Sequence, residues 1–506
     1  MINIYEPNII DYKKSAIAAI ESEWISNHGE FIKKSTQKIK EIINVKHAIL
    51  MANGTCSTHC LFLALKFKYP NISKIYVPNN CYVAAWNCLL MEYKDNLMEV
   101  MKMDINTWNI CVNEEYIKRL DSNSAVLIVH NLGNIINVPR LKRLRPDLIF
   151  IEDNCEGFTG KYENIYSGTS ESSLCSSISF YGNKIITTGE GGAFFTNDDD
   201  VYNYILKAYS QGMSSIRYLH DTHAYNYRMT NIEAAFLYDQ LNDFENIINN
   251  KKRIFENYKN LLKPLIETNR VAIFKEETNT ECANWIFALR IINNKKTIQE
   301  TTDFFKSNNI DIRPFFYPIN KHGHLKDIVF EDQVSDILNN EIIMIPSSPS
   351  ITLETQKYIV KIIEIFIDNI NIIEINDTNV ELLTQFISNP LPSTFRYFEK
   401  RTVEVIKDHA VTVLLKKEEN IIGYAHIDYE KNTNKYWFGI CILPEHHNKG
   451  YGNYLMNNIL IKSKIKNINQ IYLTVDNINI HAIKLYSKHN FKVIETNEKI
   501  TTMSLD

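Results

Sequence analysis

Between residues 40 and 240, short apolar runs alternate with segments that have helical spacing. Four runs read as strands that end in polar residues: KIYVPNN, SAVLIVHNLG, DLIFIEDN and GAFFTND. Two segments read as helices: CSTHCLFLALKF and VAAWNCLLMEY. Repeated strand and helix units form a mostly parallel sheet whose two faces are covered, so the pattern predicts an α/β fold. In such sheets, ligands bind at the carboxyl ends of the strands.

The rest of the chain is predicted to form two smaller parts. A long amphipathic helix is expected over residues 230–262, followed by mixed strands and helices over 280–367. A weak seam follows at 368–374, where a helix gives way to a new strand without a Gly- or Pro-rich linker. The remaining 135 or so residues are enough to fold alone. We therefore expect three domains, which are residues 1–240, 241–368 and 372–506.

Composition and charge exclude several classes of function for this chain. The chain of 506 residues is 45% hydrophobic and 23% charged, which is typical of a globular protein. Its net charge of -4 is spread without a basic stripe, so no nucleic-acid partner is expected. It shows neither a secretory signal nor an uncharged apolar run of about 18 residues, so we expect a cytoplasmic protein without membrane contact. Nine cysteines occur without a paired C-x-x-C, and no metal site or disulfide framework is expected.

One lysine, Lys184, lies between a strand-like run and a cluster of glycines in SFYGNKIITTGEGG (179–192). It is either a solvated loop lysine or the attachment point of a covalent cofactor. Pyridoxal phosphate needs such a lysine, an anion beside its pyridine nitrogen, amide donors for its phosphate and a flat group against its ring.

The sequence offers a candidate for each of these roles. A Gly-Thr turn at Thr55 opens a helix whose amide groups suit a phosphate. Asp153 ends an apolar strand, where a buried carboxylate needs a partner. Tyr82 could stack on a ring, and His130 ends another strand. Taken singly, each also fits an ordinary role as a helix cap, a salt-bridge acid or a core aromatic residue.

Taken together, these candidates follow strand ends in the order 55, 82, 153 and 184. Further motifs accompany them: SEWISNHGEF, ANGT, IEDNCE, YNYRMTNIEAA, RPFFYP and IPSSPS. In the order and the sequences of these motifs, roughly residues 1–367 resemble the DegT/DnrJ/EryC1/StrS sugar aminotransferases. The resemblance implies the type I fold of pyridoxal-phosphate-dependent aminotransferases, with a large, mostly parallel-sheet domain and a small C-terminal α+β domain.

The resemblance also implies residue roles. Lys184 would bind the cofactor covalently, Asp153 would pair with its pyridine nitrogen, and Glu156 would contact its phenolic oxygen. The remaining cofactor and substrate residues would be Thr55, Cys56 and Ser179 at the phosphate, Tyr82 against the ring, Asn226 at the phosphate of a neighbouring subunit, and His130, Arg313 and Tyr317 at the sugar. The role of Asn226 implies a homodimer with shared sites.

The sequences of these motifs look most like those of perosamine and viosamine synthases, which aminate nucleotide-linked 4-keto-6-deoxyhexoses with glutamate as donor. Two departures lie where the sugar would bind. Asn320 stands where the family often has histidine, and Asn131 begins NLG where the family usually has LYG. The nucleotide base and the sugar epimer therefore stay open.

A second group of candidate functional residues begins at GICILPEHHNKGYGNYLMNNIL, which is predicted to form a strand and a glycine turn that opens a helix. The turn is an ordinary strand-to-helix loop or an anion site. With LTVDNINIHAIKLYSKHNFKV downstream, residues 372–506 resemble the GNAT acetyltransferases. That resemblance implies an α/β domain that binds acetyl-CoA. The implied contacts are Asn448, Lys449, Gly450, Tyr451 and Gly452 at the pyrophosphate, Ile442 at the pantetheine arm, and Asn479 in the cofactor channel.

Tyr486 would protonate the leaving thiolate. The chain departs from the GNAT pattern at His447 and Asn490. The general base stays open: His426, Asp428 and Glu430 alternate onto one strand face, which could also be a solvated face. His426 and Asp428 are candidates for contact with the acceptor substrate, and residues 395–401 are expected to contribute to the same site.

The two resemblances lead to one hypothesis, in which the chain creates a sugar amine and then acetylates it. A related branch of the first family performs dehydration with histidine in place of the lysine, and the presence of Lys184 argues against that chemistry. The alternative for the C-terminal domain is an acetyl-CoA sensor or scaffold, or an enzyme that acetylates a different amine.

Overall fold

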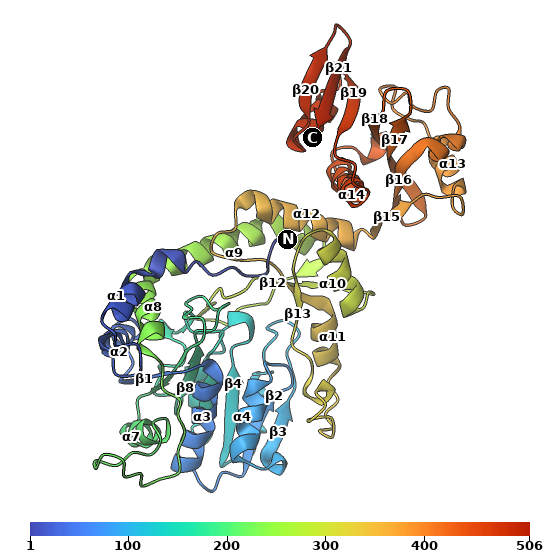
Figure 1. Cartoon of the computed structure of the whole chain (residues 1–506). Coiled ribbons are helices and arrows are strands. Elements are labelled where there is room, and N and C mark those ends of the chain that lie inside the picture. The colour runs from blue at the N-terminus through green and yellow to red at the C-terminus, as the bar shows by residue number, and fades with distance from the viewer. The chain divides into compact units, whose positions relative to one another are not determined.

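The computed structural model describes residues 1–506 and contains two compact units, Met1–Val360 and Lys361–Asp506 (Figure 1). The division falls inside helix α12 (Leu353–Ile367), ahead of the seam expected at 368–374. Residue 240 lies inside helix α8 (Asn231–Asn242), so the expected border between the first two domains would cut a helix.

The first unit is built on a seven-stranded sheet. In spatial order its strands are β1 (His47–Met51), β9 (Gly192–Thr196), β8 (Ser176–Ser179), β5 (Ile149–Asp153), β4 (Ser124–Val129), β2 (Lys74–Pro78) and β3 (Met98–Met101). Only β9 runs antiparallel to its neighbours, so the predicted mostly parallel sheet is confirmed.

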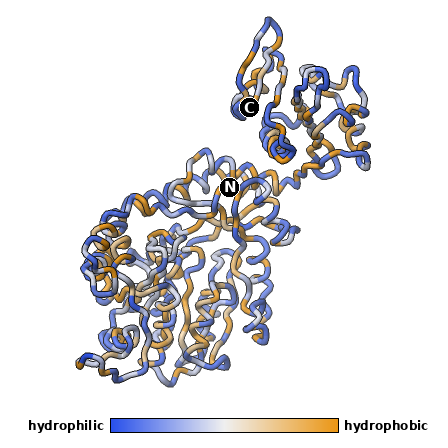
Figure 2. Tube along the Cα trace, viewed as in Figure 1, coloured by the Kyte–Doolittle hydropathy of each residue, from blue (hydrophilic) through white to orange (hydrophobic).

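Both faces of this sheet are buried, because successive side chains of each strand enter different cores. In β4, Val126 and Ile128 belong to one hydrophobic cluster, whereas Leu127 and Val129 belong to another. Figure 2 shows the hydrophobic residues concentrated along these strands. Helices α3 (Gly54–Lys68), α4 (Ala84–Glu92) and α7 (Asp199–Ala208) supply the second cluster. The first cluster is supplied by α1 (Lys14–Glu21), α2 (Glu30–Ile43), α5 (Glu114–Lys118), α6 (Val138–Leu144), α8 and α9 (Phe244–Glu267).

The helix expected over residues 230–262 is two helices, α8 and α9. A capping box between Thr230 and Glu233 starts α8. The break falls at Asp243, whose backbone is not helical (φ -107°, ψ 16°) and whose carboxylate accepts a hydrogen bond from the Tyr12 hydroxyl at 2.7 Å. Amphipathic spacing continues across the break, which is why the pattern alone predicts one helix.

Two small sheets and three helices complete the first unit. One sheet has the strands β10 (Val271–Ala272), β12 (Ala288–Ile291), β14 (Ile342–Met344) and β13 (Arg313–Pro314). The other sheet has the strands β11 (Thr280–Glu281), β6 (Lys161–Tyr162) and β7 (Ile165–Tyr166). The helices are α10 (Ile298–Ser307), α11 (Gln333–Glu341) and α12.

The second unit has its own seven-stranded sheet. In spatial order the strands are β15 (Ile370–Glu374), β16 (His409–Lys417), β17 (Asn420–Glu430), β18 (Lys435–Ile442), β19 (Ile471–Asp476), β21 (Ile500–Leu505) and β20 (Lys492–Thr496). Its helices are α13 (Glu381–Ile387), α14 (Tyr451–Ile465) and α15 (Ile480–Lys488). The parallel pair β18–β19 is in register only at Trp437 and Tyr472, so the two strands separate beyond that position.

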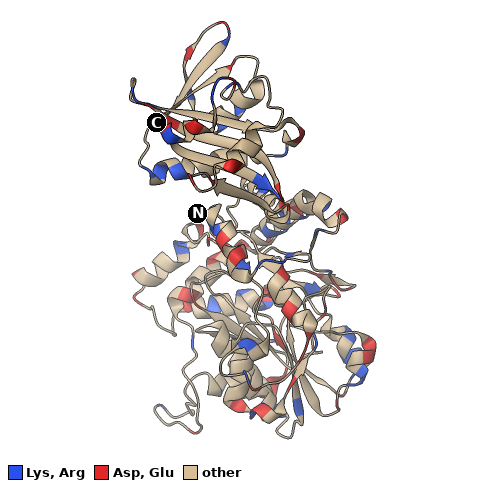
Figure 3. Ribbon diagram, turned by 90° about the vertical axis from the view of Figure 1, so that its right-hand side faces the viewer, with Lys and Arg blue, Asp and Glu red and all other residues tan.

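Lysine and arginine are interspersed with aspartate and glutamate over both units, with no large patch of one sign (Figure 3). None of the helices combines the length and the apolar character needed to cross a membrane.

Candidate active sites

The candidate residues of the first unit gather at one edge of its central sheet. β1, β4, β5 and β8 run parallel, so the residues that follow them lie at the same edge. Lys184 lies on the connection from β8 to β9. Since β9 runs back, Ser179 at the end of β8 pairs with Gly192 at the start of β9. Both ends of the lysine-bearing loop are therefore anchored at this edge.

The Lys184 amine lies between a carboxyl group and an aromatic face. Its Nζ is 3.8 Å from Oε1 of Glu156 and 3.9 Å from the centroid of the Trp285 ring. Burial raises the pKa of Glu156 from 4.5 to about 7, and the nearby Lys184 charge opposes this shift. The backbone amide of Leu132 donates a hydrogen bond to the other oxygen of Glu156 at 2.8 Å. The Glu156 carboxyl group can therefore gain or lose a proton near neutral pH.

Asp153 is a buried carboxylate at the end of β5. Its Oδ1 accepts hydrogen bonds from the Cys155 amide at 3.1 Å and from the Ser177 hydroxyl at 3.5 Å. No cationic side chain forms an ion pair with it within 4.0 Å. A buried anion of this kind gains most from a cationic partner, and a protonated pyridine nitrogen is one.

The start of α3 forms a cradle with the end of β8. A Cβ atom on Gly54 would lie 2.7 Å from Cβ of Ser179, so only glycine allows the helix to approach the serine this closely. The helix leaves the amides of Gly54 and Thr55 without internal partners, and they suit a phosphate. The amide of Cys56 instead donates to the Asn53 side chain at 2.9 Å. The Asn53 side chain therefore caps the helix by accepting from this amide, and a phosphate contact by Cys56 stays a prediction.

His130 does not present a nitrogen to a ligand. Its Nδ1 accepts from the Ile136 amide at 3.1 Å and its Nε2 lies 2.9 Å from the Glu152 carboxylate, with the side chain fully buried. The predicted contact with the sugar is corrected to a core role, because both ring nitrogens already have protein partners.

Tyr82 and Tyr317 lie on adjoining segments. Tyr82 is 60% exposed just before α4, and its ring centroid lies 6.4 Å from that of Phe316. Asn80 donates to the Phe316 carbonyl at 2.8 Å and pairs with Pro318, which holds the exposed Tyr317 beside the Tyr82 segment. Their roles toward a cofactor and a sugar stay predictions.

Arg313 and Asn226 are exposed. Arg313 lies on β13, and the Asn226 side chain accepts a hydrogen bond from Nε of Arg228 at 3.0 Å. The segment around Asn226 lies beside the end of β1, where the Ala52 amide donates to the Tyr227 carbonyl at 2.8 Å. A contact between Asn226 and a second subunit stays a prediction.

Two residues of this site escaped the sequence reasoning. The Trp285 indole N–H donates to the Asn183 carbonyl at 2.8 Å, and the Tyr5 hydroxyl donates to the Lys184 carbonyl at 2.8 Å. Together they fix the backbone around the lysine. Tyr5 and Trp285 lie far from Lys184 in sequence, and no spacing signal connects them. With the glycine cradle, the lysine and two buried carboxyl groups, the residues fit a planar cofactor that carries a phosphate.

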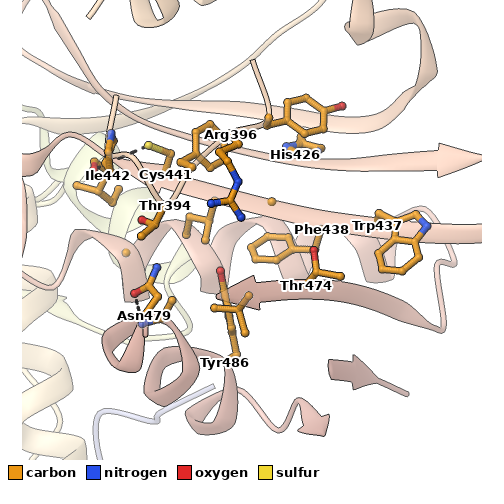
Figure 4. A pocket seen from close by; sticks show the side chains of 18 of the residues that line it. Thr394, Arg396, His426, Trp437, Phe438, Cys441, Ile442, Thr474, Asn479 and Tyr486 are labelled. Carbon is orange, nitrogen blue, oxygen red and sulfur yellow. Dashed lines mark hydrogen bonds between the residues drawn. The ribbon is translucent and has the colours of Figure 1, made fainter. Parts of the chain in front are cut away.

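The second unit contains a cavity of about 1190 Å³ where β18 and β19 separate. Figure 4 shows Tyr486 and Asn479 on one side of the strand that carries Phe438, and Arg396 and His426 on the other. The turn before α14 lines one end of this cavity. Asn448 and Gly450 both line the cavity with left-handed backbone conformations (φ 60° and 76°), which are typical of turns whose successive amides bind an anion.

The predicted acetyl-CoA residues line this cavity, except that Lys449 is absent from its wall. The Ile442 carbonyl accepts a hydrogen bond from Nε2 of His447 at 2.8 Å. The unusual histidine therefore ties the turn to β18, and this carbonyl already has a partner within the chain. Asn479 caps α15 by accepting from the Ala482 amide at 3.2 Å.

Tyr486 is buried against Phe438, with ring centroids 6.1 Å apart. Burial raises the pKa of its hydroxyl above the ordinary value, so the group keeps its proton at neutral pH. The three candidate bases on β17 differ in environment. His426 is 2% exposed, Asp428 is partly buried, and the exposed Glu430 accepts from the Trp437 indole at 3.0 Å.

Comparisons with known proteins agree with both family resemblances. Residues 10–364 match the DegT/DnrJ/EryC1/StrS aminotransferase family, and residues 377–491 match the Acetyltransferase (GNAT) family. The chain thus carries a GNAT domain after its aminotransferase domain.

Similar proteins extend over nearly the whole first unit. The GDP-perosamine synthase of Escherichia coli O157:H7 is 30% identical over 369 residues, which are 72% of this chain and 98% of that protein. The GDP-perosamine synthase of Vibrio cholerae is 32% identical, covering 63% of this chain and 85% of the relative.

Two solved structures share the fold. The Escherichia coli GDP-4-keto-6-deoxy-D-mannose-3-dehydratase with bound hydrated PLP has a TM-score of 0.65 at 19% identity, covering 72% of this chain and 99% of that one. Helicobacter pylori PseC, an aminotransferase involved in the biosynthesis of pseudoaminic acid, has a TM-score of 0.64 at 18% identity, covering 72% and 98%. The fold, the lysine-centred site and the match over residues 10–364 together establish that this chain belongs to the DegT/DnrJ/EryC1/StrS aminotransferase family.

Proposed function

We propose that this chain uses pyridoxal phosphate and glutamate to aminate C4 of a nucleotide-linked 4-keto-6-deoxyhexose, and then uses acetyl-CoA to acetylate the new amine. The observation that carries the first step is the meeting of Lys184, Glu156 and Asp153 with the start of α3 at one sheet edge. The product of that step would be a 4-amino-4,6-dideoxy sugar of the viosamine or perosamine type. The names of the two similar synthases make a GDP-linked sugar the first to test.

Bound pyridoxal phosphate would supply an electron sink that allows a proton to leave the carbon bearing the amino group. Asp153 would hold a proton on the ring nitrogen, and Gly54, Thr55 and Ser179 would hold the phosphate. Lys184 Nζ would attach the cofactor and, once released, take up and return the proton in each half of the reaction. Trp285 and Tyr5 would keep that amine in place during these transfers.

The lysine also separates amination from dehydration. By family resemblance, the dehydrating branch has histidine at this position, and a histidine cannot attach the cofactor covalently. Lys184 can, so it favours amino transfer over loss of a hydroxyl group.

The second step would take place in the cavity between β18 and β19. The sugar amine would attack the thioester carbon of acetyl-CoA, so that a C–N bond forms and the C–S bond breaks. Tyr486 would pass its hydroxyl proton to the departing sulfur. The turn from Asn448 to Gly452 would hold the pyrophosphate through its backbone amides.

The exposed position of Asn226 supports a homodimer in which this side chain reaches the phosphate site of the partner subunit. Mixing inactive Lys184→Ala chains with Asn226→Ala chains would test this arrangement. Mixed dimers should regain one intact site, and the partial return of amination would be measured against each variant alone.

One experiment tests both reactions. The intact protein is incubated with glutamate and with GDP-, dTDP- or UDP-linked 4-keto-6-deoxyhexoses, with and without acetyl-CoA, and the products are identified by mass. We expect an amino sugar without acetyl-CoA and an N-acetylated sugar with it. Lys184→Ala should give neither, whereas Lys161→Ala, on β6, should give both. Failure to aminate any of these sugars would contradict the proposal.

The second candidate for the C-terminal unit is an acetyl-CoA sensor or scaffold, or an acetyltransferase for another amine. A sensor would bind acetyl-CoA without transferring the acetyl group to the sugar. Release of only the free amino sugar at saturating acetyl-CoA would favour these alternatives.

A further inference from the structure

A buried polar network lies against the cavity of the second unit, on the β17 face that carries Asp428. The hydroxyl of Tyr397 is 2.7 Å from Nε2 of His409 and 3.1 Å from Oδ2 of Asp428. Nδ1 of His409 is in turn 2.7 Å from the Thr412 hydroxyl. The other carboxylate oxygen, Oδ1 of Asp428, is buried without a hydrogen-bond partner.

The chemistry of these groups fixes the direction of their hydrogen bonds. An ionised carboxylate only accepts, so Tyr397 donates to Asp428. The tyrosine oxygen then accepts from the Nε2–H of His409, whose Nδ1 accepts from Thr412. This order requires a neutral imidazole, and burial lowers the pKa of His409 to about 4. Each donor in the chain thus points toward Asp428.

Asp428 lies where the thioester would be presented. It pairs with Trp437 across β17 and β18, and Trp437 is the position at which β18 and β19 begin to separate. Trp437 lies five positions before Ile442 on the strand, which is ~17 Å from the residue nearest the glycine turn. An extended pantetheine arm bound at that turn can span this length.

The network and Tyr486 face opposite sides of β18. Neighbouring residues of a strand point to opposite faces, so Trp437 shares a face with Asp428, and Phe438 shares the other with Tyr486. A thioester held at the gap would therefore meet the Tyr486 hydroxyl on one side and the Asp428 carboxylate on the other.

We propose that Asp428 is the base that takes the proton from the acceptor amine, and that Tyr397, held by His409, positions its carboxylate and tunes its basicity. This inference rests on the proposed acetylation. As the amine attacks, its N–H proton passes to Asp428 while the Tyr486 proton passes to sulfur. Asp428 then releases its proton to water and Tyr486 takes one up from water, which restores the two groups.

Neighbouring groups exclude the two other candidates on β17. The His426 ring packs against the Tyr397 ring, with ring centroids 4.0 Å apart, and fills the space that a Cβ atom on Gly439 would need. Burial lowers the pKa of His426 well below its ordinary value. It is therefore a poor proton acceptor at neutral pH. Glu430 is exposed and hydrogen-bonded to Thr433 and Trp437, and its pKa is lowered.

Burial also raises the pKa of the Asp428 carboxyl group, which makes it a stronger base than an exposed aspartate. The titratable and charged groups that face Asp428 are Tyr397, Arg401, His409, His426 and Glu430. The hydrogen bond from Tyr397 and the charge of Arg401 lower this pKa, and Glu430 raises it.

Two histidines and a carboxylate can also bind a metal ion, and those of His409, His426 and Asp428 lie within 4.8 Å of one another. However, the Tyr397 hydroxyl already binds both His409 and Asp428 from the space between them. The arrangement therefore favours a hydrogen-bonded base over a metal centre.

The test uses the full chain, GDP-4-amino-4,6-dideoxymannose as the amine probe and acetyl-CoA. Asp428→Asn should lower kcat for acetyl transfer by about 10²–10³-fold and leave the acetyl-CoA Kd unchanged. Glu419→Gln, a matched loss of charge at the β16–β17 turn outside the cavity, should keep the wild-type rate. An Asp428→Asn rate within three-fold of wild type, a comparable loss in Glu430→Gln, or a rate abolished by a metal chelator would overturn the assignment.

A second variant separates positioning from mere structure. Tyr397→Phe removes a hydrogen bond that stabilises the charged form of Asp428, so the acid limb of the kcat/KM profile should move to higher pH by about one unit. The carboxylic acid C=O band in infrared difference spectra, absent in Asp428→Asn, should show the same shift without turnover. No shift in either measurement would overturn the role of Tyr397. If wild type transfers no acetyl group to any sugar amine, the proposed acetylation and the base assignment both fail, whereas the infrared titration still reports on the hydrogen bond.

Discussion

The Nζ atom of Lys184 lies 3.9 Å from the centroid of the Trp285 ring, although the two residues are about a hundred positions apart in the chain. The ring offers its electron-rich face to the ammonium group, and such contacts contribute roughly 0.5–2 kcal/mol. Trp285 also binds the carbonyl of Asn183, the residue before the lysine, so it holds both the side chain and its backbone.

Replacing this ring should slow amination without abolishing it. Trp285→Leu removes the aromatic face and the N–H donor, so we expect kcat for amination to fall by about 10-fold. Trp285→Phe keeps the face and should lose less. Single-turnover rates with saturating cofactor would measure both. Equal rates in the two variants would show that the aromatic face has no part in the effect.

Asp153→Asn should retain cofactor and lose most amination. A neutral amide cannot hold a proton on the ring nitrogen, and each pKa unit of lost pairing corresponds to about 1.4 kcal/mol, or tenfold in rate. We therefore expect a kcat loss of about 10²-fold or more at near-normal cofactor content, measured by absorbance and product formation. Asp199→Asn, which loses a surface ion pair with Lys46, serves as control. Activity within a few-fold of wild type would mean that Asp153 has a structural role.

The pKa of Glu156 predicts a pH dependence of cofactor affinity. With a pKa raised from 4.5 to about 7, this carboxyl group keeps its proton below about pH 7 and loses it above. Only the protonated form can donate a hydrogen bond to the phenolic oxygen of the cofactor. The Kd for pyridoxal phosphate should therefore increase as pH rises through 7. In Glu156→Gln, whose amide donates at every pH, the same titration should be flat, and a parallel rise in both proteins would refute the assignment.

Gly450 and Gly452 should respond differently to an added methyl group. Gly450 has φ 76°, and a Cβ there would lie 2.4 Å from Cε of Lys361, whereas a Cβ on Gly452 would make an ordinary contact at 3.5 Å with Leu485. Gly450→Ala should therefore raise the acetyl-CoA Kd by about 5-fold, from a strain of roughly 1 kcal/mol. Calorimetry on both variants would check this. Equal effects would indicate that volume near the ligand, rather than backbone conformation, limits binding.

The two activities should separate in fragments. Residues 1–368 contain every aminotransferase motif and should aminate without acetylating. A fragment of residues 361–506 should bind acetyl-CoA and acetylate a supplied amino sugar, and Tyr486→Phe should slow that step. A fragment that begins at 372 loses Lys361 and Asp368, which contact Gly450 and the Tyr451 hydroxyl beside the pyrophosphate turn. It should bind acetyl-CoA more weakly, and equal affinity in the two fragments would contradict this role.

Sequence reasoning works best where a local pattern and a strand end coincide. The apolar runs before Asp153 and Lys184 predict the strands, and the parallel order of those strands brings their ends together. The glycine turn at Gly450 is found in the same way, because a tight turn between a strand and a helix has a local signature.

The remainder depends on contacts that no local pattern records. Trp285 and Tyr5 reach Lys184 from distant segments. Tyr397 lies in the segment 395–401 that is expected at the acceptor site, but its hydrogen bond to Asp428 shows only in the fold. His130 shows the opposite error. It follows a strand end as the other candidates do, but its two nitrogens bind Ile136 and Glu152, which only the folded packing reveals.

The reversal of β9 has a consequence for turnover. A lysine that releases its cofactor must bind it again in each cycle. A lysine on a mobile chain end would have to diffuse back to the cofactor each time. Here the loop that carries Lys184 is closed by the Ser179–Gly192 pair, so diffusion of the free amine is confined to the reach of a short closed segment. Confinement of this kind keeps the amine at a high effective concentration beside its target throughout the cycle. Lengthening the loop should therefore slow recapture of the cofactor while leaving its first binding almost unchanged.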